Sequence, residues 1–171
     1  MHRPRRIVAI AACGIVLAAC SSSTASSGSS GTGTPASPAL VARTRAAHVP
    51  LLTQEGLTTH VHTTLIVKVN GKRLTVPAGI GIDEATNHIA ALHTHDATGY
   101  LHIESPKEND SFTLDQFLTL WGMPADASGR CIFFKATAPC TLSVTSKDTG
   151  PVRLDVKLAD EDTLTLTVTS P

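Results

Sequence analysis

The stretch HVHTTLIVKVNGKRLTVP at residues 60–77 decides the fold class. Its first half places an apolar residue at nearly every second position, which is the period of a strand with one buried face. These apolar residues are Val61, Leu65, Val67 and Val69. Asn70-Gly71 is the residue pair that a two-residue type I′ turn requires, and residues 73–77 then return as the partner strand. The stretch therefore predicts a β-hairpin.

Further extended segments follow the hairpin. We expect strands at residues 88–95 and 100–104, separated by a turn at 96–99, because both segments are extended in pattern and bounded by turn residues. Alternating apolar residues predict two more strands, one along 152–158 and one along 164–168, with a turn at 160–162 between them.

One helix is well marked at about residues 113–121. Thr113 and Gln116 form a capping-box pattern, and Gly122 and Pro124 end the segment. Its apolar residues fall at helical spacing on one face, and they are Leu114, Phe117, Leu118 and Trp121. A short helix is also expected at 39–47. The predicted fold class is mostly β, an antiparallel sandwich or small barrel with one packed α-helix.

The N-terminus has the three parts of an export signal. Three arginines precede an apolar stretch at residues 7–19 that is too short to span a bilayer, and the stretch ends on Leu17-Ala18-Ala19-Cys20. This ending resembles the bacterial lipobox, in which the cysteine is acylated and the chain is cut before it. We therefore expect residues 1–19 to be a signal peptide that is removed, with Cys20 as the lipid-bearing residue.

Residues 20–38 are expected to be the lipidated Cys20 followed by a flexible Ser/Gly/Thr tether, and 39–171 to be a single β-rich domain. Removing residues 1–19 leaves 11 Lys+Arg and 14 Asp+Glu, a net charge of −3 with neutral histidines. Because no basic stripe is present, we expect no nucleic-acid partner, and membrane contact should come from the lipid on Cys20. The sequence identifies no protein partner. The expected location is extracytoplasmic, on the cell membrane, or on the outer membrane in a cell that has two.

The number and spacing of the cysteines are consistent with an exported protein. With Cys13 in the signal and Cys20 acylated, Cys131 and Cys140 remain as a pair in a compartment where disulfides persist. Metal ligation and redox activity are the alternatives, but the eight intervening residues do not resemble a C-x-x-C motif. We expect a structural disulfide whose cysteines face each other across a hairpin.

Histidines recur in pairs within the extended segments. His60 and His62, His93 and His95, and His102 and Glu104 are each separated by one residue, so that both side chains of a pair point to the same side of a strand. Two imidazoles from one rigid strand, with further ligands from a neighbouring strand, are what a metal ion needs from a β scaffold. The alternative is a set of scattered or hydrogen-bonded structural histidines.

Ligand chemistry narrows the ion. Because the sequence offers no free thiolate, a sulfur-based Cu(I) site is disfavoured, whereas imidazole and carboxylate suit Zn²⁺, Cu²⁺, Ni²⁺ or Fe²⁺ alike. Asp96 and Glu104 are candidate ligands, orienting partners or general bases, although an Asp before Ala-Thr-Gly also suits an ordinary turn. His88 is five residues before His93, so that on one strand their side chains would point to opposite faces. His48 is expected to be exposed to solvent.

The motifs H-x-H, V-N-G, V-P-A-x-I-G-I, L-H-T-H-D, H-I-E-S-P, F-T-L and W-G occur in that order between residues 60 and 122. This run resembles a family of small exported bacterial domains that are found as lipoproteins or membrane-anchored proteins and have no assigned activity. The resemblance implies that the predicted ligands belong together, namely His60, His62, His93, His95, Asp96, His102 and Glu104. It does not extend to the segment between Cys131 and Cys140.

Three functions remain open from the sequence. The first is a lipid-anchored protein that binds, senses or delivers a divalent transition metal. The second is a metalloenzyme that uses the same histidines, with Glu104 or Asp96 as base. The third is a metal-free envelope protein that contacts other proteins through its β surface.

Overall fold

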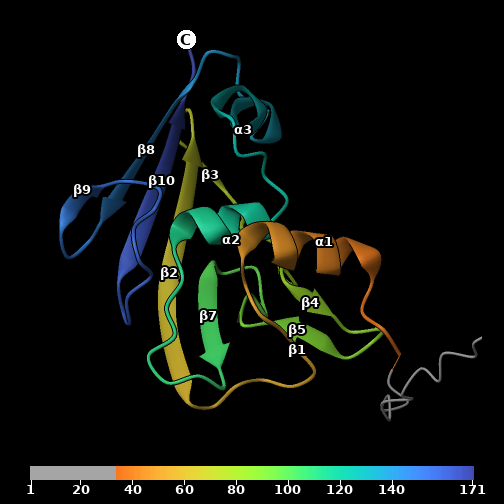
Figure 1. The fold of residues 1–171 in the computed structure, drawn as a ribbon. Helices are drawn as coiled ribbons and strands as arrows, with labels where there is room; N and C mark the ends of the chain where they lie inside the picture. The colour runs from red at the N-terminus through yellow and green to blue at the C-terminus, as the bar shows by residue number, and fades with distance from the viewer. Residues whose placement is uncertain (1–33) are drawn as a thin grey trace, which may run out of the picture. The chain divides into compact units, whose positions relative to one another are not determined.

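The computed structural model describes residues 34–171, which build two β-sheets and three helices (Figure 1). The predicted signal peptide, the predicted lipidation site Cys20 and the predicted tether up to residue 33 lie outside the described residues. Within residues 34–171, none of the helices has the length and apolar character needed to cross a bilayer. The mostly β class predicted from the sequence is confirmed.

The larger sheet has the strand order β6-β7-β2-β10-β8-β9, with β3 paired to β2 beyond the end of β7. Its strands are β2 (Thr59–Val69), β3 (Lys72–Leu74), β6 (Leu92–His93), β7 (Tyr100–Ser105), β8 (Thr141–Ser146), β9 (Gly150–Val152) and β10 (Thr163–Thr169). A smaller sheet has the order β1-β5-β4. Its strands are β1 (Leu51–Leu52), β4 (Ile82–Asp83) and β5 (His88–Ala90).

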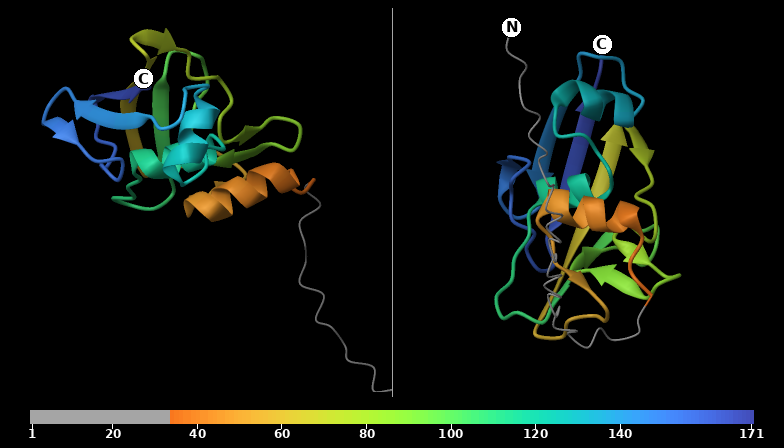
Figure 2. Two further views of the ribbon diagram at one scale, coloured as in Figure 1. Left: turned by 90° about the horizontal axis from the view of Figure 1, so that it is seen from above. Right: turned by 45° about the vertical axis from the view of Figure 1, so that its right-hand side comes forward.

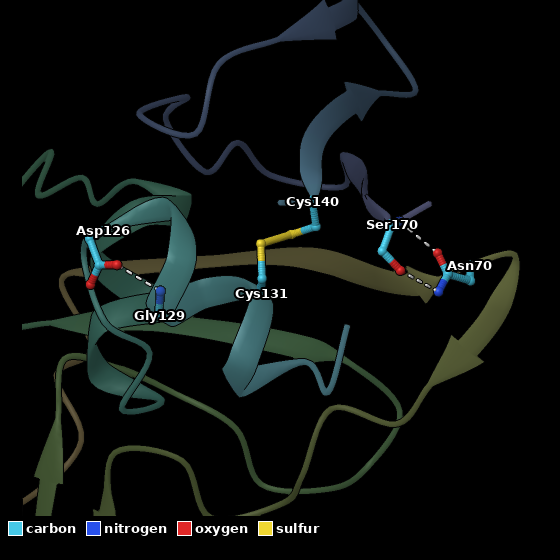
Figure 3. The surroundings of a disulfide bond; sticks show 6 residues. All are labelled: Asn70, Asp126, Gly129, Cys131, Cys140 and Ser170. Atoms are coloured by element: carbon cyan, nitrogen blue, oxygen red, sulfur yellow. Dashed lines mark hydrogen bonds between the residues drawn. A yellow bond between two sulfur atoms is a disulfide. The ribbon is translucent and has the colours of Figure 1, made fainter. Parts of the chain in front are cut away.

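The predicted hairpin is present as β2, a tight turn and β3. Asn70 and Gly71 have φ values of 49° and 80°, the positive values that the turn type requires. The Asn70 side chain also exchanges two hydrogen bonds of 2.9 Å with Ser170, which follows β10 (Figure 3). The turn is thereby fastened to the end of the neighbouring strand.

The pairing of β2 with β10 is parallel, while the other strand pairs of the described residues are antiparallel. Leu164, Leu166 and Val168 of β10 are fully buried beside Leu65 and Val67 of β2. This parallel pair joins segments about 100 residues apart, and alternation within each strand cannot report the direction of its neighbour.

The helices α1 (Pro38–Ala47) and α2 (Leu114–Leu120) lie side by side, and α2 crosses one face of the larger sheet (Figures 1 and 2). In α2 (Leu114–Leu120), Thr113 and Gln116 form the predicted capping box, and Phe117 and Leu118 are fully buried in the core. The Gln116 side chain donates a 2.9 Å hydrogen bond to the carbonyl oxygen of Ala47, the last residue of α1 (Pro38–Ala47).

A third helix, α3 (Ala127–Phe133), was not expected from the sequence. Asp126 caps it by accepting a hydrogen bond from the Gly129 amide, and Arg130 pairs with Asp115 of α2 (Figure 3 shows the cap). The expected disulfide is present, with 5.8 Å between the Cα atoms of Cys131 and Cys140. Its cysteines do not face each other across a hairpin, since Cys131 lies on α3 and Cys140 directly precedes β8.

Two strand predictions need correction. The segment 88–95 is not one strand, because the chain leaves the smaller sheet after Ala90 and enters the larger sheet at Leu92. The segment 152–158 keeps the expected alternation of burial, but β9 ends at Val152. Residues 154 and 156 instead offer their carbonyl oxygens to amides at the start of α2, so that this segment serves the helix rather than a sheet.

Candidate metal centre

The histidine pairs converge because three adjacent strands of the larger sheet are in register. β7 lies between β2 and β6, and His102 of β7 is directly opposite both His62 of β2 and His93 of β6. Glu104, two residues further along β7, is opposite His60. Since residues directly opposite in a sheet point to the same face, these five side chains share one face. Leu65 and Leu101 point to the other face, toward the core.

Each predicted His-x-His pair brings its two rings together. The Nε2 atoms of His60 and His62 are 3.0 Å apart, and those of His93 and His95 are 3.1 Å apart. Two nitrogens bound tetrahedrally to one zinc ion would lie about 3.4 Å apart, given bonds of about 2.1 Å. Small rotations of the rings would therefore bring each pair to the spacing that one zinc ion requires.

His93 is the most constrained of these residues. Its side chain is fully buried, and its Nδ1 lies 2.9 Å from the carbonyl oxygen of Ala90. Because a carbonyl oxygen only accepts, Nδ1 carries the proton, and the lone pair of Nε2 faces His95 and Glu104. Burial lowers the pKa of His93 to about 4, so the ring is neutral at pH 7 and ready to bind a metal.

Glu104 is a buried carboxylate among imidazoles. Its side chain is 5% exposed, and Oε1 lies 3.3 Å from His60 Nε2 and 3.2 Å from His102 Nδ1. Oε2 is 3.9 Å from His93 Nε2 and accepts no hydrogen bond from any described residue. A buried acceptor without a donor is costly, and it is expected where a cation normally supplies the missing interaction.

His102 occupies the centre of the cluster. Its ring meets those of His62 and His95 edge-on, with centroid distances of 4.7 and 4.6 Å, and it stacks on His93 at 5.3 Å. Burial lowers its pKa, so this ring too favours the neutral form that ligates metals.

The predicted ligands form two groups of four, in each of which one ligand atom per residue lies within 4.8 Å of the others. The first group is His60, His62, His102 and Glu104, and the second is His93, His95, His102 and Glu104. Imidazole nitrogens with one carboxylate are the donor set that Zn²⁺ and related divalent ions take. The cluster could therefore hold a metal ion.

Three residues weighed in the sequence lie outside both groups. Asp96, predicted as a ligand or base, accepts hydrogen bonds from the amide and hydroxyl of Thr98 in the turn before β7, and these bonds lower the pKa of its carboxyl. His88 donates from Nδ1 to the carbonyl oxygen of Thr86 and sits in the smaller sheet. His48 is the C-cap residue that follows α1, and it is exposed, as expected.

Three residues that contact the histidine cluster were not predicted from the sequence. Tyr100 stacks on His62 with a centroid distance of 4.8 Å, and its position two residues before His102 could have placed it on this face. Glu55 Oε1 lies 3.5 Å from His95 Nε2, and Asp160 accepts a 3.0 Å hydrogen bond from the His62 amide. Nothing local in the sequence signals these two contacts, since they join distant segments.

The cluster opens to solvent on both sides of β7. The side chains of His60 and His95 are 48% and 42% exposed, in contrast to the buried His93 and Glu104. A cavity of about 450 Å³ adjoins the second group, since His95 lines it together with Glu55, Asp83, Glu84 and His88. A small molecule could approach His95 from this cavity.

Comparison of the chain with family models, with curated proteins and with solved structures found no match. The geometry of the cluster itself therefore carries the functional assignment.

Proposed function

We propose that this protein binds a divalent transition metal, among Zn²⁺, Cu²⁺, Ni²⁺ and Fe²⁺, through the histidines of β2, β6 and β7 together with Glu104. The proposal includes the export signal and the lipid on Cys20, so that the metal is bound, sensed or delivered outside the cytoplasm. Membership of the exported family suggested by the sequence motifs belongs to the same proposal. The observation that carries it is the convergence of five imidazoles on one buried carboxylate.

The metal-free alternative is the least supported of the three functions. A surface used only for protein contacts has no need for rings with nitrogens 3.0 Å apart or for a buried carboxylate that lacks a donor among the described residues. The buried carboxylate oxygen costs stability unless a cation supplies the interaction that it lacks.

A metalloenzyme is the second candidate, and the cavity beside His95 favours it. Catalytic metal sites keep an open position next to a concave pocket, which a half-exposed ligand such as His95 would permit. Neither carboxylate of the original hypothesis suits the role of a free base. Glu104 faces the imidazoles as a ligand would, and Asp96 is engaged by Thr98.

The test is the melting temperature of the chelator-treated protein at neutral pH, with and without each of the four ions. Metal that binds the folded chain alone stabilises it, by about 2.7 kcal/mol when the free ion is at 100 times its Kd. We expect a clear rise with at least one ion. If all four leave the melting temperature unchanged, the metal proposal is wrong.

Matched variants assign the effect to the cluster. Replacing His62, His93 and His102 together by alanine removes the row that spans the three strands, and the rise should disappear. Replacing His48 and His88, which lie outside both groups, should leave the rise intact. Circular dichroism of each metal-free variant checks that it is folded.

A further inference from the structure

The two ligand groups are distinct although they share residues. Ligands of one ion lie at most about 4.2 Å apart when each bond is about 2.1 Å. The ligand atoms of the six side chains lie within 4.8 Å of one another, a wider limit than about 4.2 Å, only when they are divided into two groups of four. The six do not form one group at that limit. One pair of histidines belongs to β2 and the other to the segment at and after β6, on opposite sides of β7.

Glu104 presents one oxygen to each group. Oε1 faces His60 and His102, while Oε2 faces His93. A carboxylate that turns its two oxygens toward two sets of imidazoles has the arrangement of a bridge between two cations. The missing hydrogen bond at Oε2 is then explained, because a cation beside His93 would take the place of a donor.

We propose that the cluster holds two divalent metal ions bridged by the carboxylate of Glu104. One ion is bound by His60 and His62, the other by His93 and His95, and His102 completes one of the two. Such pairs of ions lie about 3.5–4 Å apart in two-metal sites. This inference rests on the proposed function, since it specifies how many ions the same residues bind.

The number of donor atoms shows whether the two proposed ions keep an open coordination position. Five imidazole nitrogens and two carboxylate oxygens leave at least one of the eight positions of two four-coordinate ions open. The half-exposed rings of His60 and His95 place solvent beside both ions. A water molecule or an external anionic group can therefore bind to the centre, from the cavity at His95 in particular.

The test uses the full chain, purified in detergent, stripped with a chelator and reloaded with Zn²⁺. Bound zinc per chain is measured by elemental analysis after desalting. We expect two zinc ions in the unaltered protein and in the His48→Ala/His88→Ala control. One zinc ion is expected in each half-cluster variant, His60→Ala/His62→Ala and His93→Ala/His95→Ala.

Different results separate this inference from the proposed function. One zinc ion in the unaltered chain overturns the pair of ions and leaves metal binding standing, whereas no zinc at all overturns both. Two zinc ions that both survive in a half-cluster variant also overturn the assignment, because that variant lacks one ion's histidine pair.

The bridge itself is tested with Glu104→Gln, which retains size but loses the charge. We expect both ions to bind at least tenfold more weakly, as judged by zinc competition with a chromophoric chelator. Weaker binding of only one of the two ions would show that Glu104 is a ligand of a single ion, and it would overturn the proposed bridge. The half-cluster variants decide the number of ions even if Glu104→Gln does not fold.

Discussion

At the residue scale, His93 shows how burial prepares a ligand. A fully buried imidazole whose Nδ1 donates to a backbone carbonyl has a single tautomer and a fixed ring, so Nε2 is oriented before any metal arrives. The same burial disfavours the protonated ring and lowers its pKa to about 4. Burial of His102 acts in the same direction. Both rings therefore favour the neutral form that binds a metal.

This burial predicts an acid-sensitive metal-free protein. Between pH 6.5 and 4 the unfolded chain protonates His93 while the folded chain does not, so the free energy of unfolding should fall as the pH falls through this window. The loss is at most about 1.4 kcal/mol per pH unit for this one group. Urea denaturation of chelator-treated protein at a series of pH values measures it.

A matched pair of variants isolates the contribution of His93. His93→Gln removes the buried ring and should reduce the pH dependence, to which His102 still contributes. His48→Gln, at an exposed histidine outside the cluster, is the comparison variant. An unchanged slope in His93→Gln would contradict the assignment.

At the scale of elements, β7 positions the centre. It supplies His102 and Glu104 and aligns the pairs of β2 and β6 on either side. A slip of one residue would turn every ligand of β7 toward the core, because strand side chains alternate between the faces. The start of β7 is held by Gly99, whose carbonyl oxygen accepts a 2.7 Å hydrogen bond from the Leu65 amide of β2.

Gly99 should be intolerant of any side chain. It has a φ of +89°, and an added Cβ would lie 2.3 Å from the carbonyl oxygen of Leu65. Gly79 is the matched control, since its φ is also positive, at +72°, but a Cβ there meets nothing within 4 Å. Gly79→Ala should cost about 1–2 kcal/mol from the backbone conformation alone.

Gly99→Ala should cost about 2 kcal/mol more than Gly79→Ala, because the clash forces β7 away from β2. It should also reduce the rise in melting temperature with metal, since His102 and Glu104 move with β7. Chemical denaturation and thermal melts measure the two effects. Equal stability of both variants would argue that the start of β7 does not set the register.

At the scale of the whole molecule, the centre, the disulfide and the N-terminal motif fit one location. The disulfide between α3 and the start of β8 is suited to an oxidising compartment, and in the chain-entropy model such a short loop contributes about 2.5–3 kcal/mol. With the lipid that we propose on Cys20, a metal centre open to solvent would exchange ions outside the cytoplasm and near the membrane.

The anchor is tested at Cys20. In cells that export the chain, Cys20→Ser should abolish incorporation of labelled fatty acid and leave the protein as uncleaved precursor or outside the lipoprotein fraction. Metal binding by the purified variant should be unchanged, because the ligands begin at His60. Normal fatty-acid labelling of Cys20→Ser would refute the lipid assignment.

The sequence alone was sufficient wherever a feature is local. Alternation identified β2 and the face on which His60 and His62 lie, the capping box at Thr113 placed α2, and Asn70-Gly71 set the turn. The disulfide was predicted because Cys131 and Cys140 remain once Cys13 and Cys20 are assigned to the predicted export signal. The strand, the helix and the turn each depend on residues within one element, and the periodicity of the sequence shows them directly. The disulfide depends on the number of cysteines available.

The tertiary structure decided which elements meet. Alternation states the face of a strand but not its neighbour, so the position of β7 between β2 and β6 and the parallel partner β10 could not be read from local patterns. The break after Ala90 likewise depends on distant contacts. The helix α3 has a local cap at Asp126, and the Arg130–Asp115 pair and the disulfide join it to other elements. Glu104 acquired its place between two histidine pairs for the same reason: hydrogen bonding between strands, rather than sequence spacing, brings both pairs to its two oxygens.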